Sequence, residues 1–283
     1  MPTGYLMNTV TRTTLLAWLC TLAVGGGCGP DLFNGSSHPD AGGARGPHCD
    51  RVFVLDNKSN LARFDPETLR FEDVGRLPCP LVDTLPPASL AVSHDGDLLV
   101  EYPSGDLFLL PLDLRRCINT DFFFGYSGQS YSMSFAANAP GGAQETAYVA
   151  RQVVSPFVFG IMNLGALDLT QHGYLPADAV LAGTGTADLW AVSRGTTTTV
   201  ARVDRTMPRL LDELPLADLG DTRQQNRIDL AAAFFRSDLW LFVGAGGSTA
   251  IYRVDPRSHA LTRVVANAGR RVIAATAPAC ASY

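Results

Sequence analysis

A short unit of strands and turns recurs along this chain, and this repeat limits the folds that the chain can adopt. Its clearest copy spans residues 238–265, where two apolar strands joined by a glycine-rich turn are followed by an Asp255-Pro256 turn and a third strand. Runs rich in β-branched and aromatic residues, bounded by Gly, Asp and Pro, are typical of strands. Such units have to stack side by side, because one unit cannot bury its apolar face alone.

The other copies align on the aspartate that closes the second strand. The five aspartates are 36 to 55 residues apart: Asp65, Asp113, Asp168, Asp204 and Asp255. Residues 61–66 match residues 251–256 closely, whereas the copies at Asp113 and Asp168 are weaker. A period in the forties with three or four short strands per unit is typical of β-propeller blades.

A further apolar strand stands upstream of every unit except the first. The missing strand appears at the far end of the chain, at residues 272–277. A ring of blades leaves a sheet edge open unless the last strand completes the first blade. We therefore predict an all-β fold, a five-bladed β-propeller with about four strands per blade, whose C-terminal strand closes the first blade. The alternative is a six-bladed ring with one degenerate blade hidden in residues 122–159.

The N-terminal residues indicate export. Residues 15–24 form an apolar segment of the length of a signal-peptide core, and Arg12 is the only charge before it. The run Gly25-Gly26-Gly27-Cys28 resembles the lipobox of bacterial lipoproteins, although Gly25 stands where leucine is usual. An ordinary cleaved signal with a chance cysteine is the alternative. By resemblance to known sorting patterns, Gly29 after the cysteine implies the outer membrane.

These signals divide the chain into three parts. We expect residues 1–27 to be a lipoprotein signal peptide and residues 28–48 a flexible tether rich in Gly, Pro, Ser and Asp. Residues 49–283 would form the propeller. Acyl chains such as palmitate on Cys28 would anchor the chain in the membrane, since each buried methylene contributes about 0.8 kcal/mol.

Four cysteines remain after Cys20 leaves with the signal and Cys28 carries lipid. They are Cys49, Cys79, Cys117 and Cys280. An even number in an exported chain predicts two disulfides, for which three connectivities exist. In the closing blade the last strand ends near Cys280 and its neighbour begins just after Cys49. This predicts a Cys49–Cys280 bond and leaves Cys79–Cys117 as the second.

Composition excludes some functions. The net charge is −5 and is spread along the chain, without the basic stripe that a phosphate backbone requires, so we expect no nucleic-acid partner. No apolar run of 18 or more residues occurs outside the N-terminus. We find no HExxH motif and no P-loop lysine.

The enzymatic alternative is a metal-dependent, lactonase-like hydrolase with its ion in the central channel. Its candidate ligands are acidic residues near strand ends: Asp95, Glu101, Glu145, Asp188, Asp229 and Asp238. Acidic residues at blade turns more often bond neighbouring backbone groups. We therefore favour a protein without enzymatic activity, with the hydrolase as the alternative. We expect no bound cofactor, and calcium is the ion to test.

The most unusual stretch is the aromatic run at residues 122–126. Its large side chains are Phe122, Phe123, Phe124 and Tyr126. We favour core packing under a long connection. If the run is exposed, it is an apolar patch of the kind that marks an interaction surface.

Several stretches together resemble a family of uncharacterised exported lipoproteins from myxobacteria. They are residues 89–92 with Gly96 and Tyr102, Cys117 with Thr120, residues 132–135, 145–150 and 232–242, and Cys280. The resemblance covers nearly all of the chain after the tether. It implies the propeller-like body and the envelope location, and it brings no known activity. The chain departs from the pattern at residues 274–276, where the family has a Gly-Ala-Gly-like run.

Taken together, the sequence predicts a lipid-anchored propeller that acts as a binding or scaffold module at the cell envelope. We expect a monomer whose partner is a protein or a glycan.

Overall fold

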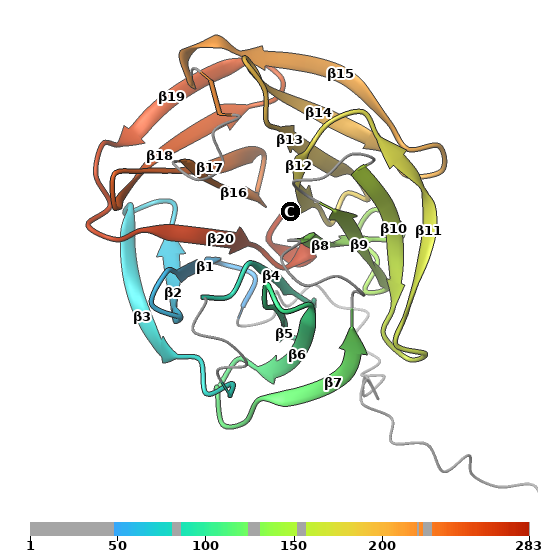
Figure 1. Ribbon diagram of the computed structural model, residues 1–283. Coiled ribbons are helices and arrows are strands. Elements are labelled where there is room, and N and C mark those ends of the chain that lie inside the picture. Colours follow the sequence, from blue (N-terminus) through green and yellow to red (C-terminus); the bar gives the residue numbers. More distant parts are fainter. Residues whose placement is uncertain are drawn as a thin grey trace, which may run out of the picture. The chain divides into compact units, whose positions relative to one another are not determined.

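The computed structural model of the protein describes residues 48–80, 86–123, 131–151, 157–219, 221–222 and 228–282. Within these residues, five four-stranded antiparallel sheets are arranged as the blades of a ring (Figure 1). The predicted five-bladed β-propeller is confirmed. The six-bladed alternative is wrong, because the described residues within 122–159 all fall in the second and third blades and form no further sheet.

Each blade begins at its innermost strand and ends at its outermost strand. The first blade contains β20 (Val272–Thr276), β1 (Val52–Asp56), β2 (Asn60–Asp65) and β3 (Arg70–Arg76). The second contains β4 (Ser89–Val92), β5 (Asp97–Glu101), β6 (Asp106–Pro111) and β7 (Ile118–Phe123). The third contains β8 (Tyr131–Ala137), β9 (Glu145–Arg151), β10 (Phe157–Asn163) and β11 (Asp168–Leu175).

In the last two blades the four strands are consecutive in sequence, from the innermost to the outermost. The fourth contains β12 (Ala179–Gly183), β13 (Leu189–Ser193), β14 (Thr198–Asp204) and β15 (Arg209–Leu216). The fifth contains β16 (Ile228–Phe235), β17 (Asp238–Ala245), β18 (Ser248–Asp255) and β19 (Ala260–Val265). Two short 3-10 turns complete the described elements, η1 (Ala217–Leu219) and η2 (Ala279–Ser282).

The ring is closed as the displaced strand predicted. Strand β20 pairs antiparallel with β1, and Phe53 lies opposite Thr276. The Cys49–Cys280 disulfide joins the chain just before β1 to η2, with the two Cα atoms 5.2 Å apart. Cys79 and Cys117 form the second bond, so both predicted pairs are present.

Five apolar clusters hold the ring together, one between each pair of neighbouring blades. Between the fifth and first blades, the ring of Phe64 packs edge-on against Trp240 and Phe242, with centroids 5.5 Å apart in both pairs. Burial at about 25 cal/mol per Å² of apolar surface makes these interfaces the main source of stability. Each blade is therefore stable only beside its neighbours.

The recurring aspartates form the turns between the third and fourth strands of the blades. The carboxylates of Asp65, Asp204 and Asp255 each accept the backbone N–H two residues later, at 2.8 to 3.0 Å. In the third blade this role belongs to Asn163, which accepts the N–H groups of Gly165 and Ala166 at 3.0 Å. The alignment on Asp168 was therefore wrong by five residues, because an asparagine forms the same turn.

Residues 1–47 lie outside the described part of the chain, so the predicted signal peptide, the lipid on Cys28 and all but the last residue of the tether stay predictions. Among the described residues, no helix is long and apolar enough to cross a membrane.

Candidate functional site at the mouth of the ring

The five innermost strands meet at the axis of the ring, where there is little room for side chains. Gly183 in β12 shows the constraint: a Cβ atom there would lie 2.0 Å from the carbonyl oxygen of Phe135 in β8. Alanines are frequent in the innermost strands, among them Ala91, Ala136, Ala182, Ala232 and Ala275, and all are buried. Their small side chains let neighbouring blades approach closely near the axis.

Each innermost strand is also a sheet edge, and on β8, β12 and β20 serine or threonine hydroxyls from the neighbouring blade accept edge N–H groups. The hydroxyl of Ser89 accepts the N–H of Met133 at 3.2 Å, and that of Ser132 accepts the N–H of Leu181 at 2.8 Å. The hydroxyls of Ser134 and Thr249 serve Gly183 and Val272 in the same way, at 2.7 and 2.9 Å. These bonds join successive blades and occupy edge groups that would otherwise pair with another strand.

One end of the axis is closed by η2. This turn contacts both β8 and β16, two of the innermost strands, and lies at the centre of the ring in Figure 1. Ala279, Cys280 and Ala281 are buried there, and the carbonyl of Ala281 accepts the N–H of Arg236 at 2.7 Å. The Cys49–Cys280 bond fixes the turn in place.

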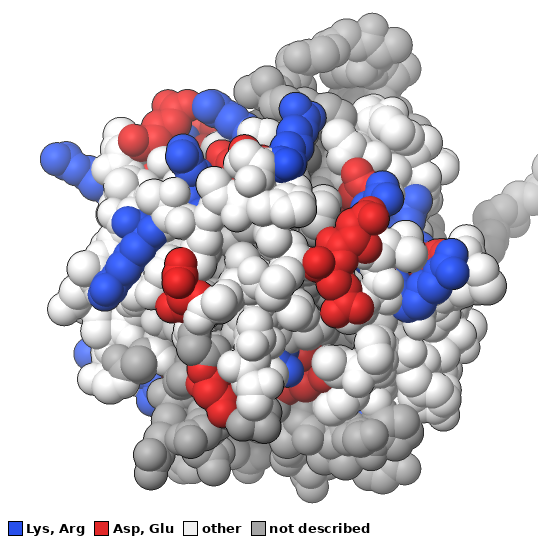
Figure 2. Space-filling view, turned by 90° about the horizontal axis from the view of Figure 1, so that it is seen from above, with Lys and Arg blue, Asp and Glu red and all other residues white. Residues whose placement is uncertain are grey.

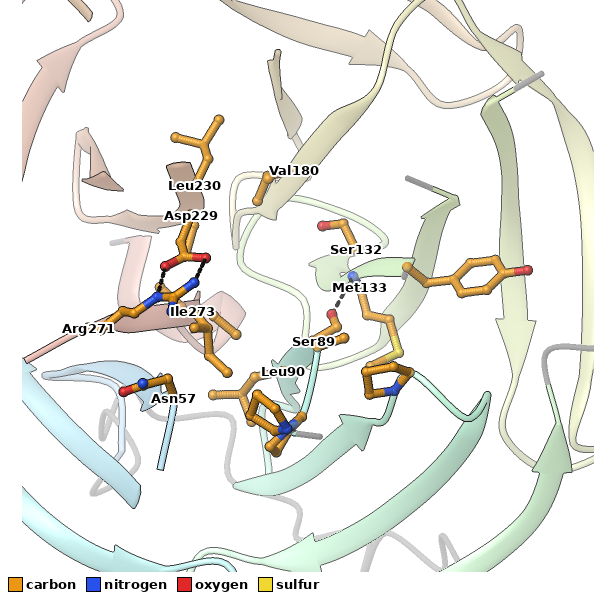
Figure 3. A pocket seen from close by; sticks show the side chains of 18 of the residues that line it. Asn57, Ser89, Leu90, Ser132, Met133, Val180, Asp229, Leu230, Arg271 and Ile273 are labelled. Atoms are coloured by element: carbon orange, nitrogen blue, oxygen red, sulfur yellow. Dashed lines mark hydrogen bonds and ion pairs between the residues drawn. The ribbon is translucent and has the colours of Figure 1, made fainter. Parts of the chain in front are cut away.

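The opposite end opens into a pocket of about 490 Å³, which we call the cup. It lies where the innermost strands begin, and all five blades contribute to its wall. Its lining residues are Asn57, Pro86, Pro87, Ala88, Ser89, Leu90, Pro103, Tyr131, Ser132, Met133, Val180, Arg194, Asp229, Leu230, Ala231, Arg271, Ile273, Ala274 and Ala275. Figure 3 shows apolar side chains such as Ile273 and Leu90 beside the polar groups of Asp229 and Arg271.

Two arginine–aspartate pairs form the charged part of the cup. Arg271 donates from Nε and Nη2 to the two carboxylate oxygens of Asp229, with 3.0 Å for the Nη2 bond (Figure 3). These bonds raise the pKa of the guanidinium. Gly244 makes room for the pair, since a Cβ atom there would lie 2.9 Å from the carboxylate of Asp229.

The second pair lies deeper. Arg194 donates from Nη1 to both oxygens of Asp178 at 3.3 Å, and from Nη2 to the carbonyl of Leu230 at 3.2 Å. Their side chains are 10% and 8% exposed. Removing one partner of such a buried pair leaves an uncompensated charge, so both are held firmly in place.

A second pocket of about 500 Å³, the outer pocket, adjoins the cup. It lies between the fifth and first blades at the same end of the ring, and it shares Asn57 and Arg271 with the cup. Its other lining residues are Asp56, Lys58, Asn60, Asp73, Gly75, Gly247, Ala268, Gly269 and Arg270. Arg270 is paired with Asp73 at 2.8 Å and lies over the ring of Phe71.

The carboxylates proposed as metal ligands do not converge. Of the six, only Asp229 lines the cup. Asp95, Glu145, Asp188 and Asp238 all lie near the turns between first and second strands, at the opposite end of the ring. No group of three or more His, Cys, Asp or Glu side chains suited to a metal ion occurs in the part of the chain that the structure describes.

Glu101 and Glu145 are the two most perturbed carboxyls. Glu101 is completely buried at the end of β5, and burial raises its pKa well above the ordinary value, an effect that the N–H of Tyr131 counteracts only in part. Burial also raises the pKa of Glu145 to about 8, while its carboxylate accepts the N–H of His94 at 2.7 Å. The Glu145 carboxyl therefore mostly holds a proton at neutral pH, and burial favours the protonated form of Glu101 as well.

The aromatic run is only partly described. Phe122 is buried in the cluster between the second and third blades, where core packing was favoured. The side chain of Phe123 and all of Phe124 and Tyr126 lie outside the described residues, so their role as an interaction loop stays a prediction. The cup residues Arg194 and Arg271 were not predicted; a charge directly before an apolar innermost strand, as at Arg271, was the available signal.

Comparisons with known proteins support the fold alone. The sequence matches no protein-family model and no curated protein. A chain of the crystal structure of a nidogen/laminin complex is similar over 80% of both chains, at 10% identity and a TM-score of 0.51. A protein of unknown function from Bacteroides caccae (15% identity, 76% of this chain and 73% of that one) and the Dos1 propeller (14%, 75% and 55%) both have TM-scores of 0.42.

Proposed function

We propose that this protein is a lipid-anchored binding module of the cell envelope that takes a small polar ligand into the cup. The observation that carries the proposal is the cup itself, which every blade helps to build and which η2 backs at the far end of the axis. Its volume lies within the 300–1,000 Å³ of typical ligand pockets. Its wall combines apolar side chains with a few fixed polar groups, as such pockets do.

The hydrolase alternative gains no support from the cup. A metal-dependent reaction needs several oxygen or nitrogen ligands around one ion. Glycoside hydrolysis needs two carboxyl groups facing each other across the substrate. Asp229 is the only carboxylate in the described wall, and it is held by Arg271.

Two disulfides fit an exported protein, since such bonds persist in oxidising compartments. The resemblance of residues 25–28 to a lipobox extends this to anchoring through Cys28 and to the outer membrane. Mass spectrometry of the N-terminal peptide tests the anchor. An acylated Cys28 is expected, together with release of the Cys28→Ser variant from membranes. An unmodified N-terminus at a residue other than Cys28 would contradict the lipid anchor.

The cup is tested by ligand-observed NMR with a library of small polar fragments and the full-length chain. Ile273 points into the cup and belongs to none of the five apolar clusters, so Ile273→Trp should fill the cup without disturbing the blades. Leu211→Trp, on outer strand β15 and away from every described pocket, is the matched control. We expect Ile273→Trp to lose most fragment signals and Leu211→Trp to keep them. Equal signals in both variants, or none in the wild type, would contradict the proposal.

A further inference from the structure

The cup and the outer pocket adjoin each other, and we call the two together the groove. Asn57 and Arg271 line both, so the groove extends from the axis of the ring outward between the fifth and first blades. The two volumes are about 490 and 500 Å³. Two adjoining pockets of similar size fit a chain-like ligand better than a compact one.

Among the described residues, the charges along the groove balance. Each of its three described arginines is paired with an aspartate: Arg194 with Asp178, Arg270 with Asp73 and Arg271 with Asp229. The other charges in the described lining are Lys58 and Asp56, and the carboxylate of Asp56 accepts the N–H groups of Lys58 and Asn60 at 2.8 and 2.9 Å. A described lining that is balanced in charge and offers both donors and acceptors favours a neutral ligand with many hydroxyl groups.

The chemistry of the wall changes along the groove. The apolar lining of the cup includes Leu90, Val180 and Ile273; Ile273 is the partly exposed one of the three, and the C–H face of a sugar ring can pack against it. The outer pocket is polar and contains three glycines, of which Gly247 and Gly269 have open space beside the backbone. Bare backbone of this kind lets a ligand approach closely.

An extended peptide is the competing chain-like ligand. Peptides that add a strand to a sheet need unpaired backbone groups at its edge. On β8 and β12 such groups are already bonded, as for Met133 and Leu181, whose N–H groups donate to Ser89 and Ser132. On the face that Figure 2 shows, basic and acidic side chains of the described residues are interspersed.

We infer that the ligand is a neutral oligosaccharide longer than a disaccharide, with one end in the cup and the following residues in the outer pocket. This inference rests on the proposed function, because it names the ligand of the same site. It predicts that affinity rises with chain length until the groove is filled. It also predicts that the cup and the outer pocket contribute separately.

Isothermal titration with full-length protein tests the inference. The probes are hexasaccharides and disaccharides of β-1,4-glucose, α-1,4-glucose, β-1,4-mannose and β-1,4-N-acetylglucosamine, with hexagalacturonate as the acidic comparison. We expect at least one neutral hexasaccharide to bind tenfold or more tightly than its disaccharide, and hexagalacturonate to bind more weakly. If no neutral hexasaccharide binds, or if the acidic one binds best, the inference is overturned; fragment binding in the cup would still stand.

Substitutions at a matched pair of glycines distinguish binding in the outer pocket from binding in the cup. Gly269 (φ 69°) lines the outer pocket and Gly246 (φ 61°) lines no described pocket; a Cβ atom at either would meet nothing within 4 Å. Asparagine tolerates this left-handed conformation. Gly269→Asn should weaken hexasaccharide binding at least fivefold and leave disaccharide binding unchanged, whereas Gly246→Asn should change neither. An unchanged hexasaccharide Kd in Gly269→Asn would refute the path through the outer pocket.

Discussion

Removing the Cys49–Cys280 bond should destabilise this ring more than removing Cys79–Cys117. The first bond links residues 231 positions apart and the second links residues 38 apart. In the chain-entropy model the first therefore stabilises the fold by about 5.5 kcal/mol and the second by about 4 kcal/mol at 25 °C. The longer loop spans all five blades, so its loss frees the whole unfolded chain.

The comparison uses two double variants, Cys49→Ser with Cys280→Ser and Cys79→Ser with Cys117→Ser. Both replace two cysteines by serine, at buried positions except for the partly buried Cys117, so the difference reports mainly on loop length. Urea unfolding followed by the fluorescence of Trp190 and Trp240 gives the free energy of unfolding. We expect the first variant to be the less stable by about 1–2 kcal/mol.

Two outcomes would refute this reasoning. If the Cys79/Cys117 variant is the less stable, loop length does not govern the effect. If losing Cys49–Cys280 costs less than about 1 kcal/mol, the pairing of β20 with β1 closes the ring without the bond.

The other predictions concern substitutions at Gly183, Glu145 and Glu101. Gly183→Ala places a methyl group 2.0 Å from the carbonyl oxygen of Phe135, so unfolding in urea should show a loss of about 3 kcal/mol or more; wild-type stability would mean that β8 and β12 separate easily. Because the folded pKa of Glu145 is raised to about 8, its contribution to stability is complete below the unfolded value of 4.5 and is lost as the pH rises to 8. Glu145→Gln should flatten this fall, by at most about 4 kcal/mol between pH 5 and 8, in melts across that range; an unchanged pH profile would argue against the burial effect. Burial raises the pKa of Glu101 well above its ordinary value, so Glu101→Gln should make the free energy of unfolding less dependent on pH above the unfolded value of 4.5, and an unchanged pH dependence would argue against the burial effect.

The ring could be predicted because its signals are local and repeated. The Asp turns, the apolar strands and the displaced strand at residues 272–277 each lie within a few residues of sequence, and they agree with one another. The disulfides followed from the ring closure. One turn is misaligned, at Asp168 instead of Asn163. Asparagine and aspartate form the same turn, so an alignment on aspartates alone misses the asparagine of the third blade.

The candidate site could not be predicted in the same way. Its parts come from all five blades, and the pairs that shape it are distant in sequence, such as Asp229 with Arg271 and Ser89 with Met133. The serines carry no catalytic signal, because they bond the backbone of the next blade. Most of the acidic residues chosen as channel ligands lie at the other end of the ring, since a period alone does not tell which end of a strand faces the mouth.

A crystal of the protein soaked with small polar fragments would show directly where ligands bind. Ordered fragments should gather in the cup, within hydrogen-bond distance of Arg271, Asp229 or the serines, and none should enter from the end closed by η2. Fragments that gather on the opposite face of the ring, near Asp95 and Glu145, with none in the cup, would contradict the proposed binding in the cup.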